Sequence, residues 1–451
     1  MTDLALTDLI QKPIVQLRGI LQDPNDPNCG PEEFVVFGAM GCFDEFPSSQ
    51  IYDYTRRTKS AKKFNQLKDR LLDETAGRGH GAVLDQGEYL YSIKDLPRLV
   101  TMHICQHQFM EHLQQSMRRA RAERSYIPES VIAHNLESAV DLLSSSSDLY
   151  EELSSNNIPL EDARFTLPLY AKTNIQTKGD ARALTQLLCL SRSENMPSIV
   201  RETVEDMISK ASELTPRMFK QRANNFDVRQ QYPCPNILAT KNDSLKRYIQ
   251  SLGPDIPDVY LVSKNDLFPI SEETMRKAII EKDPTELSNL KQVSYKFLAK
   301  MSLVVYHHII RHRTWNQTAE SIYDAAERAE FIIPPSIQAN PEMLSKFNDM
   351  NQRMLEFYND LVKQGIPKQE AIGFLPHSLA VYDIFNVDGW NAVYALGKRR
   401  CTQSQWETTN IANKVANIIN VQRPVLGQYC KPQCVIDGVC PERETCGKYK
   451  K

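Results

Sequence analysis

The chain has 451 residues, 41% of them hydrophobic, and a formal net charge of −2 at pH 7. This length accommodates two domains of ordinary size, and the apolar content excludes extensive disorder. The near-zero charge disfavours a dedicated nucleic-acid binder, and no apolar stretch is long enough to span a bilayer. Residues 1–11 carry two aspartates and no basic cluster. A signal peptide would need that cluster, so we expect a soluble, cytoplasmic protein.

Turn-forming residues and apolar periodicity predict the elements in chain order. Breaks are predicted at residues 23–31, 221–235, 334–341 and 429–451. Strands are predicted at residues 34–37, 87–93 and 258–262. Helices are predicted at residues 136–156, from Pro159 as a first helical position, and at residues 181–190 and 199–214. Helices therefore outnumber strands, and an α+β protein is indicated.

An internal repeat is the most informative feature of the sequence. Gln106-His107-Gln108 matches Arg311-His312-Arg313 at an offset of 205 residues, and Ser116 matches Ser321 at the same offset. At an offset of 208, residues 158–168 and 366–376 share the pattern Ile-Pro-x-x-x-Ala-x-x-x-Leu-Pro. A surface loop would absorb the three-residue drift. The chain is therefore interpreted as two diverged copies of one domain.

The segment Arg311-His312-Arg313-Thr314 groups the residues best suited to bind an anion. Two guanidiniums beside an imidazole can hold a phosphate or pyrophosphate through charge-assisted hydrogen bonds. The alternative is a helix C-terminus whose cations suit the helix dipole. Ser321 follows His312 by nine residues, which on one continuous helix would put them on opposite faces. A site that uses both would need a helix break or a neighbouring subunit.

The first copy distributes its polar residues differently. It has glutamines where the second copy has Arg311 and Arg313, but Ser116, Arg118 and Arg119 follow as a hydroxyl with cations. A solvated basic helix surface is the alternative interpretation of this charge run.

Taken together, these motifs resemble the signature of the flavin-dependent thymidylate synthases, which is Arg-His-Arg followed by a serine. Residues 79–84 (GHGAVL) resemble the family's Gly-His-x-Ser segment. Arg164, Arg182 and Arg201 lie in segments that resemble its later arginine motifs, and residues 399–407 (RRCTQSQWE) resemble its Arg...Ala-Gln-Trp-Glu segment. The resemblance covers residues 34–214 and, more weakly before His308, residues 260–419.

The resemblance implies reductive methylation of deoxyuridylate with FAD, a reduced nicotinamide (NADPH) and methylenetetrahydrofolate. It further implies roles for individual side chains. The flavin would be held by Arg311, His312, Arg313 and Thr314, with Arg182, Gln186 and His80 near it. The nucleotide would be bound by Ser116, Arg118, Arg164, Ser321 and Arg399, with Arg164 reaching a nucleotide held by a partner domain. Arg399, which would contact the uracil ring, and Ser321 are the expected catalytic residues.

Each copy departs from the family pattern, and the departures are complementary. The second copy replaces later polar residues of the first with Tyr323, Ile372, Trp390 and Tyr394. The first copy has Ser191 where the second has Arg399, although Arg192 is adjacent, and His103 and His308 stand where the family has glutamine. If sites form from both copies, a homodimer of tandem chains would supply four domains as a pseudo-tetramer.

The last 22 residues contain Cys430, Cys434, Cys440 and Cys446. Four thiolates suit a zinc ion or an iron–sulfur cluster, while free thiols or disulfides are the alternatives. The six other cysteines are scattered singly and are expected to be free thiols.

We therefore expect two repeats, each a small mixed or antiparallel sheet packed with long helices. The expected boundaries are an N-terminal extension at 1–30, repeats at 31–220 and 241–428, a linker at 221–240 and a Cys-rich tail at 429–451. The leading function is that of a thymidylate synthase of the flavin-dependent type, with a nucleotide substrate and no membrane or nucleic-acid partner. The alternatives are a flavin enzyme acting on another pyrimidine nucleotide, or a non-catalytic nucleotide-binding or scaffold protein.

Overall fold

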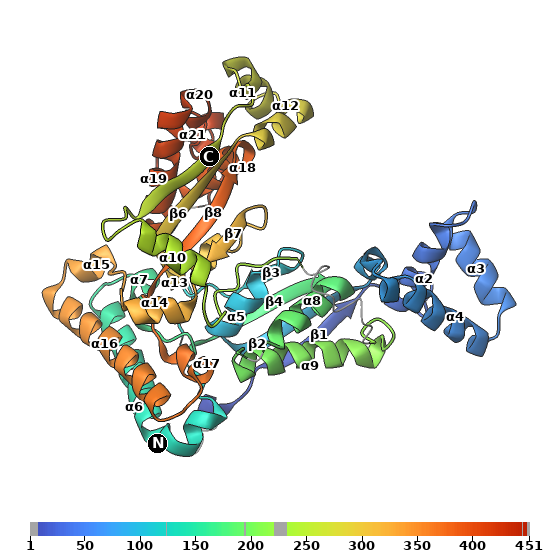
Figure 1. Ribbon diagram of the computed structural model, residues 1–451, viewed down its shortest axis with the longest axis horizontal. Coiled ribbons are helices and arrows are strands. Elements are labelled where there is room, and N and C mark those ends of the chain that lie inside the picture. Colours follow the sequence, from blue (N-terminus) through green and yellow to red (C-terminus); the bar gives the residue numbers. More distant parts are fainter. Residues whose placement is uncertain (1–7, 123, 194, 221–231, 444, 449–451) are drawn as a thin grey trace. The chain divides into compact units, whose positions relative to one another are not determined.

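A computed structural model describes residues 8–122, 124–193, 195–220, 232–443 and 445–448. The chain forms two compact units (Figure 1). Unit 1 comprises Met1–Glu152, Leu167–Cys234 and Glu356–Phe374, and unit 2 comprises Leu153–Thr166, Pro235–Leu355 and Leu375–Lys451. Each unit is thus assembled mainly from one repeat, with a short segment supplied by the other.

Unit 1 contains a four-stranded antiparallel sheet in the order β1-β2-β4-β3. The strands are β1 (Ile14–Ile20), β2 (Glu88–Pro97), β3 (Glu111–Gln114) and β4 (Lys172–Asp180). Alternate residues of β2 face the core, where Tyr89 and Tyr91 are fully buried. The Tyr91 hydroxyl donates to the Met207 carbonyl oxygen of α9 (Ser198–Leu214) at 3.0 Å, so α9 covers this face.

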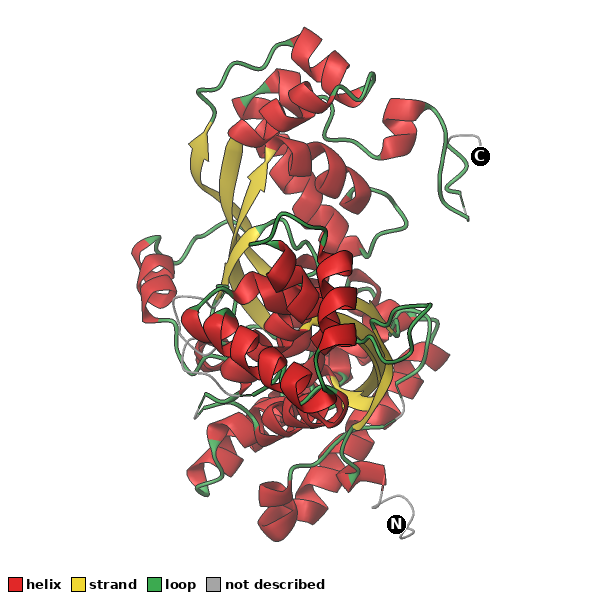
Figure 2. Ribbon diagram, turned by 90° about the vertical axis from the view of Figure 1, so that its right-hand side faces the viewer, coloured by secondary structure: helices red, strands yellow, loops and turns green. Residues whose placement is uncertain are grey.

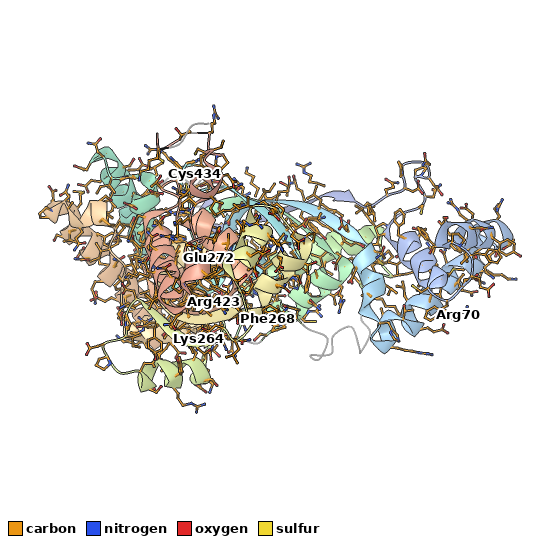
Figure 3. The ribbon with its side chains drawn as sticks, turned by 90° about the horizontal axis from the view of Figure 1, so that it is seen from above. Arg70, Lys264, Phe268, Glu272, Arg423 and Cys434 are labelled. Carbon is orange, nitrogen blue, oxygen red and sulfur yellow. The ribbon has the colours of Figure 1, made fainter. Side chains whose placement is uncertain are left out.

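One group of helices in unit 1 lies near the sheet. A second group lies beyond the end of the sheet (Figures 1 and 2). The group near the sheet comprises α5 (Arg98–Cys105), α8 (Ala181–Ser191) and α9, whereas α6 (Glu129–Ser155) lies apart from the sheet, at the lower left of Figure 1. The group beyond it comprises α2 (Pro31–Gly41), α3 (Ser48–Thr58) and α4 (Ala61–Glu74), followed by η1 (Ala76–Arg78) and η2 (Gly81–Gln86). Arg70 of α4 projects from the outer end of this group (Figure 3).

Unit 2 repeats the same sheet in the order β5-β6-β8-β7, again antiparallel throughout. Its strands are β5 (Val259–Asn265), β6 (Ser294–Ser302), β7 (Asn316–Ala319) and β8 (Ala380–Asp388). One face carries Leu298 and Tyr382, which pack with Leu245 of α10 (Asp243–Ser251). The opposite face buries Phe297 and Phe385 beneath the later helices.

The helices of unit 2 follow the same order as those of unit 1, with additions at both ends. Those along the repeat are α13 (Leu303–Ile309), α14 (Ile322–Arg328), α15 (Pro335–Gln338), α16 (Pro341–Lys363, whose residues from Glu356 on belong to unit 1), α18 (Gly389–Arg399) and α19 (Trp406–Gln422). The remaining ones are α11 (Glu272–Ile279), α12 (Pro284–Asn289), η6 (Leu290–Gln292), α20 (Pro424–Gly427) and α21 (Gln433–Asp437). Figure 3 shows Cys434 of α21 and Lys264 of β5 at opposite edges of this unit.

Local sequence explains why the same helix starts at the same place in both repeats. Asp180 accepts a hydrogen bond from the Ala183 amide at 2.7 Å and caps α8. Asp388 accepts one from the Asn391 amide at 2.8 Å and caps α18. An aspartate at this position satisfies an amide that has no partner within the helix. The α+β fold with two repeated sheets is therefore confirmed.

The two repeats exchange equivalent short segments. From repeat 1, α7 (Leu160–Ala163) and η3 (Arg164–Thr166) belong to unit 2, and from repeat 2, α17 (Lys368–Ala371) and η7 (Ile372–Phe374) belong to unit 1. The compact units therefore differ from the contiguous boundaries expected at 31–220 and 241–428. This exchange decides which side chains can meet.

An acidic residue anchors each exchanged segment. In unit 2, Asp162 accepts hydrogen bonds from the Trp406 indole at 2.8 Å and the Ser336 hydroxyl at 2.6 Å. In unit 1, Glu370 accepts from the Ser198 amide at 2.8 Å and the Ser198 hydroxyl at 2.9 Å. Asp162 and Glu370 are equivalent in the repeat, so the two anchors are reciprocal.

Several expected elements differ from the structure. Residues 34–37 were expected as a strand but lie inside α2, because Pro31 occupies the first turn and the Glu33 carboxylate accepts from the Gly30 amide at 3.1 Å. Pro159 precedes α7 as its N-cap, with an extended ψ of 143°, and is not its first helical residue. The break expected at 334–341 contains the short helix α15.

The other predicted helices and strands are confirmed with shifted ends. Helix α6 begins at Glu129, earlier than predicted, because it continues through non-helical dihedrals at Asn135 (φ −137°, ψ 24°). Most of the predicted linker, residues 221–231, lies outside the described residues.

Candidate functional site

The Arg-His-Arg segment of repeat 2 forms a turn between α13 and β7. The His312 ring accepts a hydrogen bond at Nε2 from Arg399 Nε at 2.9 Å. Arg399 is the last residue of α18, and its Nη2 also lies 3.5 Å from the His308 carbonyl oxygen. Two residues predicted from separate motifs, His312 and Arg399, are therefore in direct contact within unit 2.

Aromatic and polar neighbours orient this pair. The His312 ring stacks on Trp315, with ring centroids 4.6 Å apart, and Trp315 stacks on Phe385 of β8 at 5.1 Å. The Thr314 hydroxyl donates to the Asn391 side-chain oxygen of α18 at 2.8 Å. The turn is thus fixed against both the sheet and α18. Arg311 is partly exposed and Arg313 is exposed.

Burial lowers the pKa of His312 to about 3, and the positive charges of Arg399, Lys398 and Arg311 lower it further. The imidazole is therefore neutral at physiological pH. Because Nε2 accepts from a guanidinium, the ring proton must be on Nδ1. His312 acts as an acceptor that holds Arg399 in place.

Arg164 reaches the same unit through the exchanged segment. Its side chain is 97% buried, and its Nε donates to the Glu161 carbonyl oxygen at 3.1 Å. Burial raises the pKa of Glu407 to about 7, while hydrogen bonds from Ser302 and the charge of Arg164 act in the opposite direction. Arg164 therefore lies near the first turn of α19.

A short chain of contacts connects that turn to Arg399. Thr408 follows Glu407 in α19, and its hydroxyl lies 3.1 Å from His308 Nδ1. The carbonyl oxygen of His308 is the one that Arg399 approaches. Unit 2 thus gathers Arg164 from repeat 1 with His312 and Arg399 from repeat 2.

Ser321 has a structural position that differs from its expected role. Its side chain is fully buried and caps α14, accepting from the Tyr323 amide at 3.2 Å and donating to the Ala239 carbonyl oxygen at 2.6 Å. The same segment also binds the next residue of the chain, because the Ile322 amide donates to the Ile237 carbonyl oxygen at 3.0 Å. The hydroxyl is hydrogen-bonded within the protein, and the role of Ser321 in binding nucleotide stays a prediction. Strand β7 provides the break between His312 and Ser321 that one shared site would have required.

The equivalent loop of unit 1 is open. Ser116 is exposed, and its hydroxyl oxygen accepts from the Arg118 amide at 3.3 Å. The amides of Arg119 and Ala120 donate to the Ser116 carbonyl oxygen. Ser116, Arg118 and Arg119 therefore lie on one tight turn, and a hydroxyl with two guanidiniums is a combination that suits an anion.

The other expected residues of unit 1 lie on η2 and α8. Gln186 Oε1 accepts from His107 Nε2 at 3.2 Å, and Arg182 pairs with Asp85 at 3.3 Å. His80 is exposed immediately before η2. Burial lowers the pKa of His107 to about 4, so this imidazole is also neutral.

The C-terminal cysteines do not form the expected metal group. Within the residues that the structure describes, no three histidine, cysteine, aspartate or glutamate side chains are arranged to hold a metal ion, so zinc or an iron–sulfur cluster is not supported. All ten cysteines, including the six scattered ones, are free thiols. Cys430 is buried and donates to the Leu426 carbonyl oxygen at 3.5 Å. The thiols whose charges act on Cys434 are those of Cys440, Cys401 and Cys446, so Cys430 is set apart from the others.

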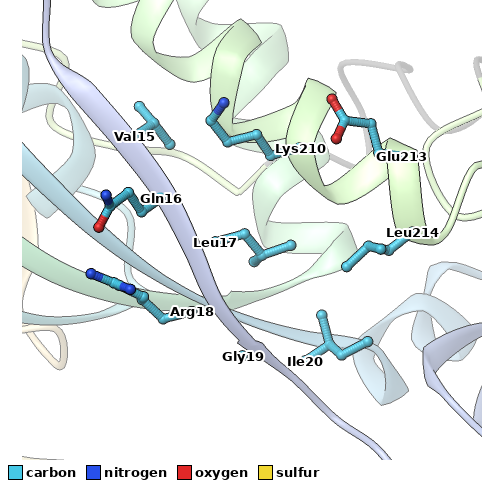
Figure 4. Close-up of a pocket in the computed structure, with 9 residues that line it drawn as sticks. All are labelled: Val15, Gln16, Leu17, Arg18, Gly19, Ile20, Lys210, Glu213 and Leu214. Carbon is cyan, nitrogen blue, oxygen red and sulfur yellow. The ribbon is translucent and has the colours of Figure 1, made fainter.

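A groove in unit 1 carries none of the expected residues. It lies between β1 and α9, where Leu17 and Ile20 face Lys210 and Leu214 (Figure 4). Its polar members are held by two separate elements and no buried polar group points into it. We assign it no role.

Comparison with known families decides the identity of the fold. The family described as "Thymidylate synthase complementing protein" matches residues 26–217 and again residues 265–425. These two matches span most of the chain and correspond to the two repeats. The chain belongs to this family.

Curated relatives within the family carry the name flavin-dependent thymidylate synthase. The protein from Thermococcus onnurineus is 29% identical over 153 residues, covering 32% of this chain and 62% of the relative. The protein from Clostridium tetani is 25% identical over 209 residues, covering 40% of this chain and 84% of the relative. The protein from Saccharolobus solfataricus is 26% identical over 217 residues, covering 47% and 80%.

A solved structure is also similar to the chain. It is the UMP/dUMP methylase PolB from Streptomyces cacaoi bound with 5-Br dUMP, with 15% sequence identity and a TM-score of 0.39. The match covers 47% of this chain and 94% of the PolB chain. Separately, no helix among the described residues is long and apolar enough to cross a membrane.

Two further residues support the motifs of this thymidylate synthase complementing family member. Trp315 supports the His312 ring and Asn391 holds Thr314, although neither was among the predicted site residues. The position of Trp315 directly after the Arg-His-Arg-Thr segment was the available sequence signal. Nothing local marked Asn391, because its partner is distant in the sequence.

Proposed function

We propose that this protein is a flavin-dependent thymidylate synthase that methylates deoxyuridylate, with methylenetetrahydrofolate as carbon donor and NADPH as reductant. The observation that carries the proposal is the meeting of residues from both repeats in unit 2. Arg164 from repeat 1 lies there with the His312–Arg399 pair of repeat 2. Each repeat can therefore have lost some of the family's polar residues while unit 2 keeps an active site.

The turn at residues 311–314 fits an anionic cofactor such as FAD. Arg311 and Arg313 flank a fixed histidine in a partly exposed turn, and two guanidiniums in this pattern suit a diphosphate. When bound, the flavin would supply hydride transfer, and the protein would supply orientation and charge. Arg182, Gln186 and His80 of unit 1 are proposed as further flavin contacts on the basis of the family resemblance.

Arg399 is the residue proposed to act on the pyrimidine ring. His312 anchors its Nε, so the guanidinium has a fixed direction before any ligand binds. A preorganised cation beside a uracil carbonyl would stabilise the negative charge that develops as the ring is activated. Arg164 would add positive charge at the same end of α19. Ser116 and Arg118 are proposed to bind a nucleotide phosphate in unit 1.

A different pyrimidine nucleotide is the second candidate substrate. The observation that favours it is that the residues expected beside the pyrimidine ring are altered, since the first copy has Ser191 where the second has Arg399. A non-catalytic scaffold is the third candidate, and it would follow if the remaining cations bound nucleotide without turnover.

The test combines flavin binding with turnover. Purified protein titrated with FAD should develop the absorption of bound flavin at about 450 nm. With deoxyuridylate, methylenetetrahydrofolate and NADPH, the protein should produce thymidylate, measured by mass spectrometry. Uridylate and deoxycytidylate in parallel reactions would reveal the second candidate.

Variants locate the activity. Arg399→Gln and Arg164→Gln should each reduce kcat/KM by about 100-fold or more, because each removes a preorganised charge. Arg276→Gln is the matched control, since Arg276 is an exposed arginine of unit 2 paired with Glu281. Wild-type-like turnover in Arg399→Gln, or protein that acquires no flavin, would refute the proposal.

A further inference from the structure

A second pocket lies on unit 2, on a different face of α18 from the one that carries Arg399. It has a volume of about 330 Å³ and is bounded by α11, α12, α18 and the C-terminal tail. Trp390, Tyr394 and Lys398 line it at intervals of four residues along one face of α18. Asn391 and Arg399 project from a neighbouring face toward the 311–314 turn, so the two sites share none of these side chains.

One wall of the pocket is aromatic. The Trp390 and Tyr394 rings stack with centroids 4.9 Å apart and nearly parallel planes at 18°. Tyr394 is 50% exposed, so part of its ring is accessible at the pocket. Leu287, Val393 and Ile436 complete the apolar part of the lining. This wall can accept the face or edge of a planar ring.

The rim of the pocket is cationic. Lys398 lies with its Nζ 4.4 Å from the centroid of the Tyr394 ring and donates to the Tyr394 hydroxyl at 2.8 Å, so its ammonium is held at the pocket. Lys282 and Lys431 also line the pocket, and no salt bridge joins either to an acid within the described part of the chain. Asp437 is the one acidic lining residue, and it accepts from the Gln433 amide at 2.8 Å. Three lysines against one carboxylate leave a net positive charge.

The tail wall is fixed in place by its packing on α18. The Lys431 carbonyl oxygen lies 2.5 Å from the position that a Cβ would take at Gly397, so only glycine permits this approach. The Arg400 guanidinium donates to the Cys430 carbonyl oxygen, and its Nε donates to Asn413 at 2.8 Å. The cavity is therefore preformed, and Lys431 of the tail is held close to Trp390 and Tyr394.

We propose that this pocket binds a small aromatic anion, the chemical class to which mononucleotides belong. The aromatic wall would contact the planar ring, and the lysine rim would pair with the phosphate. A volume of about 330 Å³ is near the lower end for small-molecule sites and suits a ring with one anionic group better than a dinucleotide. The site is separate from the proposed active site and does not depend on its function.

Fluorine NMR of the full chain tests this assignment. The chain contains three tryptophans, so 5-fluorotryptophan labelling gives three resonances, and Trp390→Phe assigns the one of interest. Titration with AMP, GMP, UMP and CMP should shift the Trp390 resonance saturably with at least one nucleotide. Adenosine and ribose 5-phosphate, each lacking half of the ligand, should bind at least tenfold more weakly than the best mononucleotide.

A lysine variant separates this site from any other nucleotide site. Lys282→Gln combined with Lys431→Gln should raise the dissociation constant reported by the Trp390 resonance by at least tenfold. Lys277→Gln, which changes a lysine of α11 that does not line the pocket and pairs with Glu273, should leave it within twofold. Absence of any shift at Trp390, or unchanged affinity in the double variant, would overturn the proposal. Shifts confined to Trp315 or Trp406 would report the proposed active site and would likewise overturn it.

Discussion

At the scale of single residues, the central feature is a histidine kept neutral so that it can hold an arginine. His312 accepts from Arg399 and stacks on Trp315, and this arrangement is incompatible with a protonated Nε2. A histidine with a lowered pKa stabilises the fold above its unfolded pKa of about 6.5. That contribution is lost as the pH falls from about 6.5 toward 3, where the folded-state ring titrates.

The first prediction concerns this pair. In Arg399→Gln, the ring loses an adjacent positive charge and gains access to water, so the pKa of His312 should rise from about 3 toward the ordinary histidine value. The measurement is a pH titration by NMR of protein labelled with ¹⁵N-histidine. Arg313→Gln serves as control because Arg313 is not among the charges that lower this pKa. Wild-type His312 titrating near pH 6.5 would contradict the geometry.

The second prediction concerns Glu407. Its pKa is raised by burial to about 7, so the folded state binds the proton more tightly than the unfolded state. The stability that it contributes is complete below the unfolded pKa of about 4.5 and is lost as pH rises through about 7. Glu407→Gln should flatten the pH dependence of the unfolding free energy over that interval, by at most about 3 kcal/mol.

Urea denaturation at several pH values measures this slope. Gln405 is part of the same first turn, but it carries no charge, so Gln405→Ala controls for loss of the α19 cap. An unchanged slope in Glu407→Gln would show that this carboxyl does not titrate between pH 4.5 and 7.

At the scale of elements, equivalent helices of the two repeats are held by equivalent acids with different partners. Asp162 binds an indole and a hydroxyl, whereas Glu370 binds an amide and a hydroxyl of one serine. Both carboxylates are buried, so removing either leaves donors without acceptors. The exchanged segments are therefore specified by a few polar contacts in addition to apolar packing.

The third prediction follows from these anchors. Asp162→Ala should destabilise the protein by about 1–3 kcal/mol, because two buried donors lose their acceptor. Asp162→Asn keeps one acceptor and should cost less. Chemical denaturation followed by tryptophan fluorescence is informative, since Trp406 is one of the donors.

Glu342→Ala is the matched control for the acid anchors. Its carboxylate is 71% exposed and pairs with Lys346 one turn away, so its loss should change stability far less than the loss of Asp162. Equal effects of Asp162→Ala and Glu342→Ala would mean that the anchor contributes no more than a surface pair.

At the scale of the whole molecule, the exchange of segments gives unit 2 side chains from both repeats. Repeat 1 retains Arg164 and repeat 2 retains His312 and Arg399, yet all three lie in unit 2. Each copy has lost residues that the other retains, and unit 2 still contains all three of these retained side chains. The counterpart of Arg164, Ile372, lies in unit 1 and is fully buried, which is consistent with a structural role there.

The fourth prediction concerns assembly. By the family resemblance, we propose that two chains form a homodimer, a pseudo-tetramer of four domains. Each chain has a mass of 51.6 kDa, so light scattering after size exclusion should report twice that value, about 103 kDa. A mass of one chain at micromolar concentration would exclude a stable dimer.

Much of this protein was determined by local sequence. The repeat, the α+β class and the capped helices α8 and α18 follow from spacing, periodicity and aspartate caps, all of which act over a few residues. The Arg-His-Arg-Thr turn was recognisable for the same reason. Where capping competed with apolar character, as at residues 34–37, the cap prevailed and a helix formed.

Only the tertiary structure decided which of these residues meet. Arg399 contacts His312 across 87 positions of sequence, and Arg164 enters unit 2 because its segment is exchanged. The burial of Ser321 likewise depends on the chain near Ala239, and the isolation of Cys430 from the other tail thiols depends on packing. Hydrogen bonds and desolvation act between neighbours in space, and sequence spacing does not encode such neighbours when they come from distant segments.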